Sequence, residues 1–115
     1  MTAEDYVPEA GDLIWTEFDP VRGREQSGRR PALVVSAAAF ARLTGLAVVC
    51  PITTRVRPFP TSVVLPPELP VQGEVLLSHI RSIDTLARPV LYAGGRIAPS
   101  LAAEVRAKLA AFITI

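Results

Sequence analysis

The chain has 115 residues, of which 50% are hydrophobic and 20% are charged, and its formal net charge is +1. This composition predicts one globular domain, residues 1–115, and it excludes both a disordered chain and binding of nucleic acid through a global positive charge. The 11 prolines and 7 glycines favour short strands joined by tight turns over a helical bundle.

The single cysteine, Cys50, excludes an internal disulfide and a multi-cysteine zinc site. Its apolar neighbours favour a buried, inert thiol over a reactive one. No apolar run approaches the roughly 18 residues that a membrane span needs, and the acidic N-terminus lacks the apolar core of a signal peptide. We therefore expect a cytoplasmic protein that makes no membrane contact.

The first half of the chain predicts three strands and one short helix. Residues 12–18 predict a strand with apolar groups on both faces, as in a small closed barrel. Residues 31–35 predict the second strand and residues 46–51 the third. Between them, Ser36 is the expected cap of a short helix over residues 37–43.

The second half predicts further short strands and a terminal helix. Residues 61–65 predict a β-branched strand, and residues 73–84 predict either a strand pair or one long strand with a bulge near His79. Residues 90–97 predict the last strand. Pro99 opens a helix whose apolar residues recur at helical spacing, namely Leu101, Val105, Leu109 and Phe112. The whole pattern predicts a mainly β fold, a small barrel with appended helices.

A charged, glycine-bounded loop precedes the second strand and ends in Arg29-Arg30-Pro31. Pro31 disfavours the helical region for the residue before it, so Arg30 is expected to be extended at the start of a strand. An arginine held in this way suits the grip of a phosphate through two parallel hydrogen bonds. On this segment alone, an ordinary solvated loop is the favoured alternative, because two arginines before a strand are common.

Three blocks of sequence together resemble the MazF/PemK toxin family, in family order and over nearly the whole chain. Each block is weakly specific by itself, but the three together are strongly specific. They are Gly11-Asp12-Leu13-Ile14-Trp15 followed by Phe18-Asp19-Pro20 and Gly23-x-Glu25-Gln26-x-Gly28-x-Arg30-Pro31-Ala32-Leu33-Val34-Val35; then Pro51-Ile52-Thr53-Thr54; and then Leu77-x-x-Ile80-Arg81-Ser82-Ile83-Asp84.

The resemblance implies an SH3-like barrel with short helices that forms a homodimer. It implies a metal-independent endoribonuclease without a cofactor, which cuts single-stranded RNA at short sequences and leaves a 2′,3′-cyclic phosphate and a 5′-hydroxyl. It also implies that the protein is the toxin of a type II toxin–antitoxin pair, with a cognate antitoxin as partner. Carried over position by position, the family's essential arginine is Arg30 and its essential threonine is Thr53. Its Glu-Gln pair falls on Glu25 and Gln26.

The chemistry of RNA cleavage also requires such groups, whatever the family resemblance implies. One group must take the proton of the 2′-hydroxyl, another must protonate the leaving 5′-oxygen, and donors must stabilise charge on the phosphate. Arg30 offers the charge and Thr53 a hydroxyl, while Glu25 is the best base candidate, although a glutamate needs burial to act efficiently. We predict the catalytic residues Arg30, Thr53 and Glu25, no metal site, and the RNA-binding residues Gln26, Arg29, Thr54, Arg55, Arg57, Phe59, His79 and Arg81.

Several readings stay open at this point. His79 stands where the family often has glutamine, and a hydrogen-bonded structural histidine is favoured over a proton shuttle. An ion pair between Arg81 and Asp84 is favoured over contact of Arg81 with RNA, and Trp15 is expected in the core. The rival functions are a non-catalytic toxin of the same fold that inhibits a protein target such as DNA gyrase, and a decayed homologue that only binds RNA or its antitoxin.

Overall fold

The computed structural model describes residues 5–18 and 28–115, and the predicted site residues Glu25 and Gln26 lie outside these ranges. Within them the chain forms seven strands, two α-helices and one 3-10 helix. In chain order these elements are β1 (Asp12–Thr16), β2 (Arg30–Val34), α1 (Ala38–Thr44), β3 (Leu46–Thr53), β4 (Ser62–Val64), β5 (Glu74–Leu76), η2 (Leu77–His79), β6 (Arg81–Asp84), β7 (Val90–Arg96) and α2 (Pro99–Phe112).

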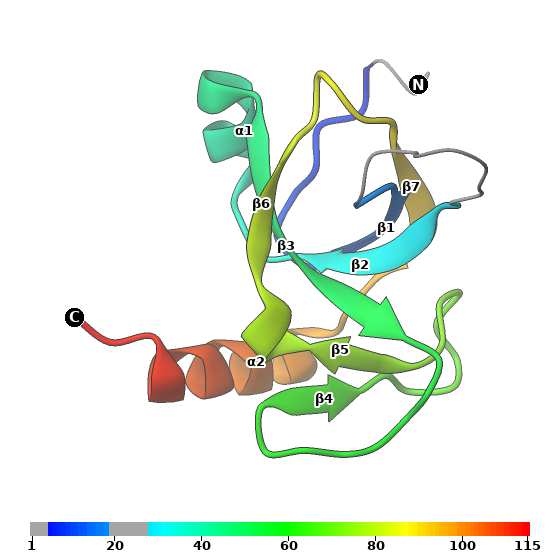
Figure 1. Ribbon diagram of the computed structural model, residues 1–115, viewed down its shortest axis with the longest axis vertical. Helices are drawn as coiled ribbons and strands as arrows, with labels where there is room; N and C mark the ends of the chain where they lie inside the picture. Colours follow the sequence, from blue (N-terminus) through cyan, green and yellow to red (C-terminus); the bar gives the residue numbers. More distant parts are fainter. Residues whose placement is uncertain (1–4, 19–27) are drawn as a thin grey trace.

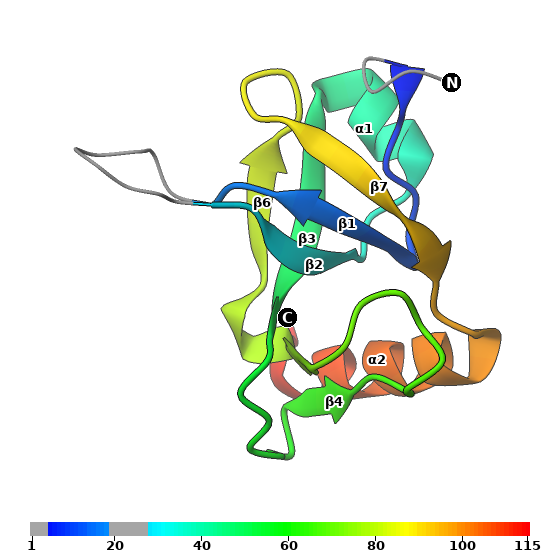
Figure 2. The ribbon, with the colours of Figure 1, turned by 90° about the vertical axis from the view of Figure 1, so that its right-hand side faces the viewer.

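All seven strands belong to one antiparallel sheet, organised around the long strand β3 (Figures 1 and 2). The order along the main path is β4-β5-β3-β2-β1-β7, and β6 also pairs with β3. One edge of β3 serves two neighbours, because residues 46–49 pair with β6 whereas Ile52 and Thr53 pair with β5. The opposite edge of β3 pairs with β2. The carboxyl end of β3 is therefore flanked by β2 and β5.

Apolar side chains are buried on both faces of the sheet. One cluster includes Leu13 and Cys50 and extends to Val105 of α2. The other cluster includes Ile14 and Val34. Neighbouring residues of a strand point to opposite faces, so Leu13 and Ile14 of β1 feed the two clusters separately. The prediction that the first strand carries apolar groups on both faces is confirmed.

The two helices lie at opposite ends of the molecule, with α1 at one end and α2 beside β4 at the other (Figures 1 and 2). Helix α2 starts with Pro99 in its first turn, as predicted, and buries Val105 against the sheet. Its Lys108 Nζ donates to the carbonyl oxygen of Ser62, 2.8 Å away, and thereby ties the helix to β4. No helix in the described part of the chain has the length and apolar character needed to cross a membrane.

The cap of α1 differs from the prediction. Oε1 of Glu9 accepts the N–H of Ala38 at 2.8 Å, so the first turn of the helix is capped by a residue 29 positions upstream. Ser36 was the predicted cap, but its Oγ accepts the N–H of Val48 on β3 instead, at 2.8 Å. Ser36 does not cap the helix because its hydroxyl oxygen is hydrogen-bonded to the neighbouring strand β3.

The predicted fold class, mainly β with short helices and a C-terminal helix, is confirmed. The ladder itself does not close within the described residues, since β4 and β7 remain the two ends of its path. The predicted element over residues 73–84 is two strands, β5 and β6, which both pair with β3, and the irregularity near His79 is the 3-10 helix η2 between them. Because β5 pairs with Ile52 and Thr53 and β6 pairs with residues 46–49, η2 lies beside the part of β3 between these two pairings.

Candidate functional site

A groove of about 670 Å³ lies where β2, β3 and η2 meet, a volume ordinary for a ligand pocket. Among the described residues it is lined by Trp15, Arg29, Arg30, Pro31, Pro51, Ile52, Thr53, Thr54, Pro70, Val71, Gln72, Leu76 and His79. This described lining contains two guanidinium groups and no carboxylate. Such a surface attracts anions, and guanidinium groups suit phosphate in particular. We call this pocket the groove.

The register of β2 against β3 brings Arg30 level with Thr53. Ala32 is paired with Pro51 and Val34 with Val49. Continuing this antiparallel register by two residues sets the first residue of β2, Arg30, opposite the last residue of β3, Thr53. Arg30 is exposed and Thr53 is half-buried, and both line the groove. The two residues predicted to be essential are thus brought to one place.

The hydroxyl of Thr53 is held by the loop that follows it. Its Oγ1 accepts the backbone N–H of Arg55 at 3.1 Å. A threonine hydroxyl has one hydrogen to donate and lone pairs with which to accept. Because the loop donates to the oxygen, the hydroxyl hydrogen of Thr53 is left for an acceptor in the groove. A phosphate oxygen is such an acceptor.

The same loop, residues 54–61, is fastened by a buried carboxylate on β5. Glu74 is only 1% exposed, and its Oε1 accepts the N–H of Arg57 at 2.6 Å. Its Oε2 accepts a short hydrogen bond from the hydroxyl of Ser62. Ser62 Oγ in turn accepts the N–H of Phe59 at 3.2 Å. The hydrogen bonds from Ser62 and from the Arg57 N–H hold the pKa of Glu74 below its usual range, so the carboxylate is charged at neutral pH.

Gly73 allows β5 to lie this close to Thr53. Its φ of +133° is a conformation that side chains disfavour, and a Cβ there would overlap the carbonyl oxygen of Thr53. The backbone of β3 and the start of β5 are consequently in direct contact at this end of the groove. Any side chain at position 73 must displace Thr53.

His79 and Trp15 both line the groove, whereas the sequence favoured a structural histidine and a tryptophan in the core. His79 is exposed at the end of η2, so the expected position of this histidine on a strand is wrong. Trp15 is half-buried: it packs against the core cluster of Leu13 and also faces the groove. The prediction that Trp15 belongs to the core therefore covers only one of its two environments.

The remaining predicted RNA-binding residues fall into two groups. Arg29 and Thr54 line the groove, whereas Arg55, Arg57 and Phe59 lie on the loop beyond it. These three loop residues are exposed, and Phe59 retains 65% of its surface in solvent. The loop thus presents two cations and an aromatic ring beside the groove.

Arg81 does not line the groove. Its guanidinium lies 5.2 Å from the centre of the Phe18 ring and donates to the carbonyl oxygen of the same residue at 3.4 Å. The expected ion pair with Asp84 is wrong, because the Asp84 carboxylate accepts the N–H groups of Leu86 and Ala87 instead. Residues three apart on a strand point to opposite faces, which explains the missing pair.

Cys50 takes no part in the groove. It is fully buried in the core, and burial raises the pKa of its thiol to about 12, so the inert reading is supported. Within residues 5–18 and 28–115, no three histidine, cysteine, aspartate or glutamate side chains are grouped so that they could hold a metal ion.

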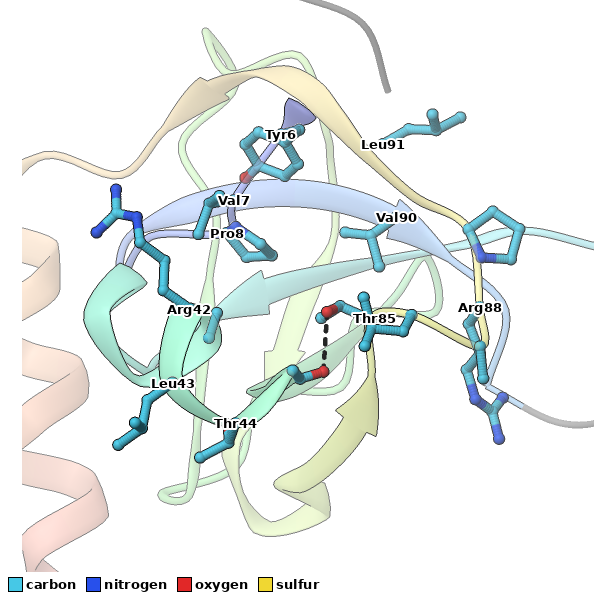
Figure 3. Close-up of a pocket in the computed structure, with 15 residues that line it drawn as sticks. Tyr6, Val7, Pro8, Arg42, Leu43, Thr44, Thr85, Arg88, Val90 and Leu91 are labelled. Carbon is cyan, nitrogen blue, oxygen red and sulfur yellow. Dashed lines mark hydrogen bonds between the residues drawn. The ribbon is translucent and has the colours of Figure 1, made fainter. Parts of the chain in front are cut away.

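A second hollow, of about 780 Å³, lies between the N-terminal segment, the end of α1 and the turn from β6 to β7 (Figure 3). Several of its polar groups are engaged within the protein. Thr85 Oγ1 donates to the carbonyl oxygen of Gly45 at 2.8 Å, and Arg88 donates to the carbonyl oxygens of Glu17 and Phe18. None of the predicted site residues that the structure describes lines this hollow, so the groove remains the candidate site.

Sequence reasoning did not identify Glu74 as part of the site. The available signal was a lone carboxylate directly before the apolar run Val75-Leu76-Leu77, since charged side chains rarely enter strand interiors. Its hydrogen-bond partners, however, lie 12 and 17 residues earlier in the chain. Only the pairing of β4 with β5 brings them together.

Comparison with known proteins identifies similar sequences and structures along nearly the whole chain. The family described as "PemK-like, MazF-like toxin of type II toxin-antitoxin system" matches residues 9–113. The Escherichia coli K12 protein named "Endoribonuclease toxin MazF" is 38% identical over 104 residues, which are 90% of this chain and 92% of that protein. The structure of MazF from Deinococcus radiodurans is 47% identical, with a TM-score of 0.81, and the match covers 93% of this chain and 96% of that one.

A structure described as an endoribonuclease in complex with its cognate antitoxin, from a mycobacterial species, is also similar. It is 26% identical with a TM-score of 0.72, and the match covers 90% of this chain and 92% of that one. The family match spans nearly the whole chain. It includes β2 with Arg30, β3 with Thr53 and η2 with His79. This chain belongs to the PemK-like, MazF-like toxin family of type II toxin–antitoxin systems.

Proposed function

We propose that this protein is an endoribonuclease toxin that cuts single-stranded RNA at short sequences without a metal ion. The observation that carries the proposal is the meeting of Arg30 and Thr53 in one groove whose described lining is cationic and free of carboxylates. Family membership supports it, because the curated relatives are named as endoribonucleases. The proposal extends to the whole chain, residues 1–115, as a single toxin domain.

The reaction is an attack of the 2′-oxygen on the adjacent phosphorus. A P–O2′ bond forms, the P–O5′ bond breaks, and the products carry a 2′,3′-cyclic phosphate and a 5′-hydroxyl. Negative charge on the phosphate oxygens grows in the transition state. Arg30 binds two of these oxygens with its planar fork, and Thr53 donates its free hydroxyl hydrogen to one of them. Both groups are anchored on strands and need little reorganisation.

Two protons must move in this reaction. A base removes the proton of the 2′-hydroxyl, and an acid protonates the leaving 5′-oxygen. His79 is a candidate for either role, because imidazole exchanges protons near neutral pH and this side chain lines the groove. Glu25 remains the second candidate base, and its position lies outside the described residues.

RNA on either side of the cut meets further groups. Arg29 and Thr54 contact the backbone inside the groove, and Arg55 and Arg57 follow the phosphates along the loop. Phe59 offers a ring on which an unpaired base stacks, as in other proteins that bind single-stranded RNA. Of the other predicted RNA-binding residues, Gln26 lies outside the described residues, and Arg81 contacts Phe18 outside the groove.

The proposed partners follow from the same chemistry. The guanidinium groups that hold phosphate also hold carboxylate, so an acidic antitoxin segment competes with RNA for the groove. The mycobacterial endoribonuclease in complex with its cognate antitoxin supports such a partner. We further propose that the protein acts as a homodimer in the cytoplasm.

The test is incubation of the purified protein with long single-stranded RNA in EDTA. We expect cleavage at a short recurring sequence, with a 2′,3′-cyclic phosphate on one product and a 5′-hydroxyl on the other. A substrate with 2′-deoxyribose at the cut nucleotide should stay intact, because it lacks the attacking oxygen. Intact RNA in cells whose growth is arrested by the toxin would instead favour inhibition of a protein target.

A further inference from the structure

Glu74 is the most deeply buried charged side chain among the described residues, and the proposed chemistry does not use it. It lies on β5, the strand between β3 and β4, where it is paired with Thr53 on one side and Val64 on the other. Burial of a carboxylate is costly unless hydrogen bonds satisfy it. An apolar residue at this position of a small β-sheet would avoid that cost. The groups that are hydrogen-bonded to the Glu74 carboxylate therefore indicate which part of the protein this residue stabilises.

Those hydrogen bonds lead to the loop of residues 54–61. The carboxylate accepts the N–H of Arg57 directly and reaches the N–H of Phe59 through the Ser62 hydroxyl. Thr53 holds a third N–H of the same loop, that of Arg55. Pro58 and Pro60 have no N–H to offer. Side chains of β3, β4 and β5 thus accept hydrogen bonds from every second backbone N–H of the loop between residues 55 and 59.

The charges and exposure of the loop point to a ligand outside the protein. Its backbone is held from within, while the side chains of Arg55, Arg57 and Phe59 face solvent. A loop serving only as a connection needs neither a buried anion beneath it nor an exposed ring above it. The pattern suits a preorganised surface that reads a flexible strand.

We propose that Glu74 is a positioning residue that sets RNA sequence preference, by holding the 54–61 loop so that Phe59 and Arg57 meet the RNA beside the scissile phosphate. This inference rests on the proposed function of the groove. Glu74 itself does not line the groove and takes no part in proton transfer. Its loss should therefore loosen recognition while the cleavage step continues.

The test compares Glu74→Gln, Glu74→Val and Ser62→Ala with the wild type. Glu68→Gln is the matched control, since Glu68 is an exposed acid on the turn between β4 and β5. Trp15 is the only tryptophan and lines the groove, so its fluorescence reports RNA binding at the site. Sequencing the 5′ ends of the RNA fragments reports the preferred sequence, and far-UV circular dichroism reports folding.

We expect Glu74→Val to raise KM about tenfold, to spread cuts over additional sequences, and to change kcat by less than about threefold. Glu74→Gln should lie between it and the wild type, because its amide oxygen keeps one of the two accepted hydrogen bonds. Ser62→Ala should change the preference in the same direction. Glu68→Gln should match the wild type in every readout.

Unchanged cut sites and KM in folded Glu74→Gln and Ser62→Ala proteins would overturn the inference, and these two variants decide the matter if Glu74→Val does not fold. A fall in kcat at constant KM and constant preference would also overturn it. If the wild type leaves RNA intact, the proposed function fails and this inference fails with it. If the wild type cuts RNA and the variants cut alike, only this inference fails.

Discussion

Thr53 and Glu74 are paired across β3 and β5, and each accepts a backbone N–H from the same loop, Thr53 from Arg55 and Glu74 from Arg57. This pairing joins the proposed chemistry to the proposed recognition. Thr53 faces the groove with its hydroxyl hydrogen free, and Glu74 stays buried beneath the loop. A change in Thr53 should therefore affect the scissile phosphate directly, whereas a change in Glu74 should affect the loop.

Replacement of Thr53 tests the role of its hydroxyl. Thr53→Val keeps the shape of the side chain and removes the donor to the phosphate, so we expect kcat to fall roughly 10²-fold, the usual cost of losing one such donor. Thr53→Ser keeps the hydroxyl and should retain most of the activity. Single-turnover cleavage rates measure both. Equal rates for the Val and Ser variants would show that the hydroxyl does not contribute.

Replacement of Gly73 tests how strictly the groove depends on the approach of β5 to β3. Gly73→Ala puts a Cβ against the Thr53 carbonyl at a positive φ, so we expect a loss of stability of about 1–3 kcal/mol together with reduced cleavage. Gly94→Ala is the control, since its φ is also positive but nothing lies within 4 Å of its Cβ position. Urea unfolding compares the two variants. A Gly94 variant destabilised as much as the Gly73 variant would contradict the contact argument.

That Arg30 and Thr53 would be candidates for one site was predictable from sequence, because both residues sit in local motifs. Pro31 fixes the backbone of Arg30, and the third strand leads directly into Thr53. The register between these strands was not predictable, yet it is what brings the two residues together. The supporting groups were missed for the same reason: Glu74 and Glu9 act on partners far away in the chain. Ser36 was wrongly predicted as a helix cap because its hydroxyl oxygen instead accepts a hydrogen bond from the neighbouring strand β3.

His79→Gln tests proton transfer by the imidazole. If His79 gives or takes a proton, the pH profile of the wild-type rate should differ from that of the variant, because a glutamine side chain cannot exchange that proton. In that role its loss should lower the rate roughly 10²-fold, whereas a rate close to the wild type would match the glutamine that relatives often have at this position. RNA affinity, followed by Trp15 fluorescence, should change little, because glutamine keeps the hydrogen-bonding capacity. Parallel pH profiles for the two proteins would exclude His79 as the acid or base.

Glu9 predicts how stability depends on pH. The N–H groups of Ala38 and Ala10 donate to its carboxylate and hold its pKa below the ordinary value of 4.5. A depressed folded-state pKa means that the stabilisation is complete above about pH 4.5 and is lost as pH falls through the folded value. Glu9→Gln should therefore be less stable than the wild type at pH 7, with the difference shrinking at low pH. Urea unfolding at pH 7 and pH 3 measures this, and an equal difference at both pH values would count against it.

The most direct test of the whole account is the cleavage rate of Arg30→Ala on single-stranded RNA in EDTA, beside wild type and Arg106→Ala. Arg106 is an exposed arginine of α2 outside the groove, so its variant controls for the loss of one positive charge. The account predicts that Arg106→Ala cuts like the wild type, while Arg30→Ala is slower by roughly 10²-fold or more. Equal cutting by all three proteins, at the same sequences, would contradict the assignment of the groove as the active site.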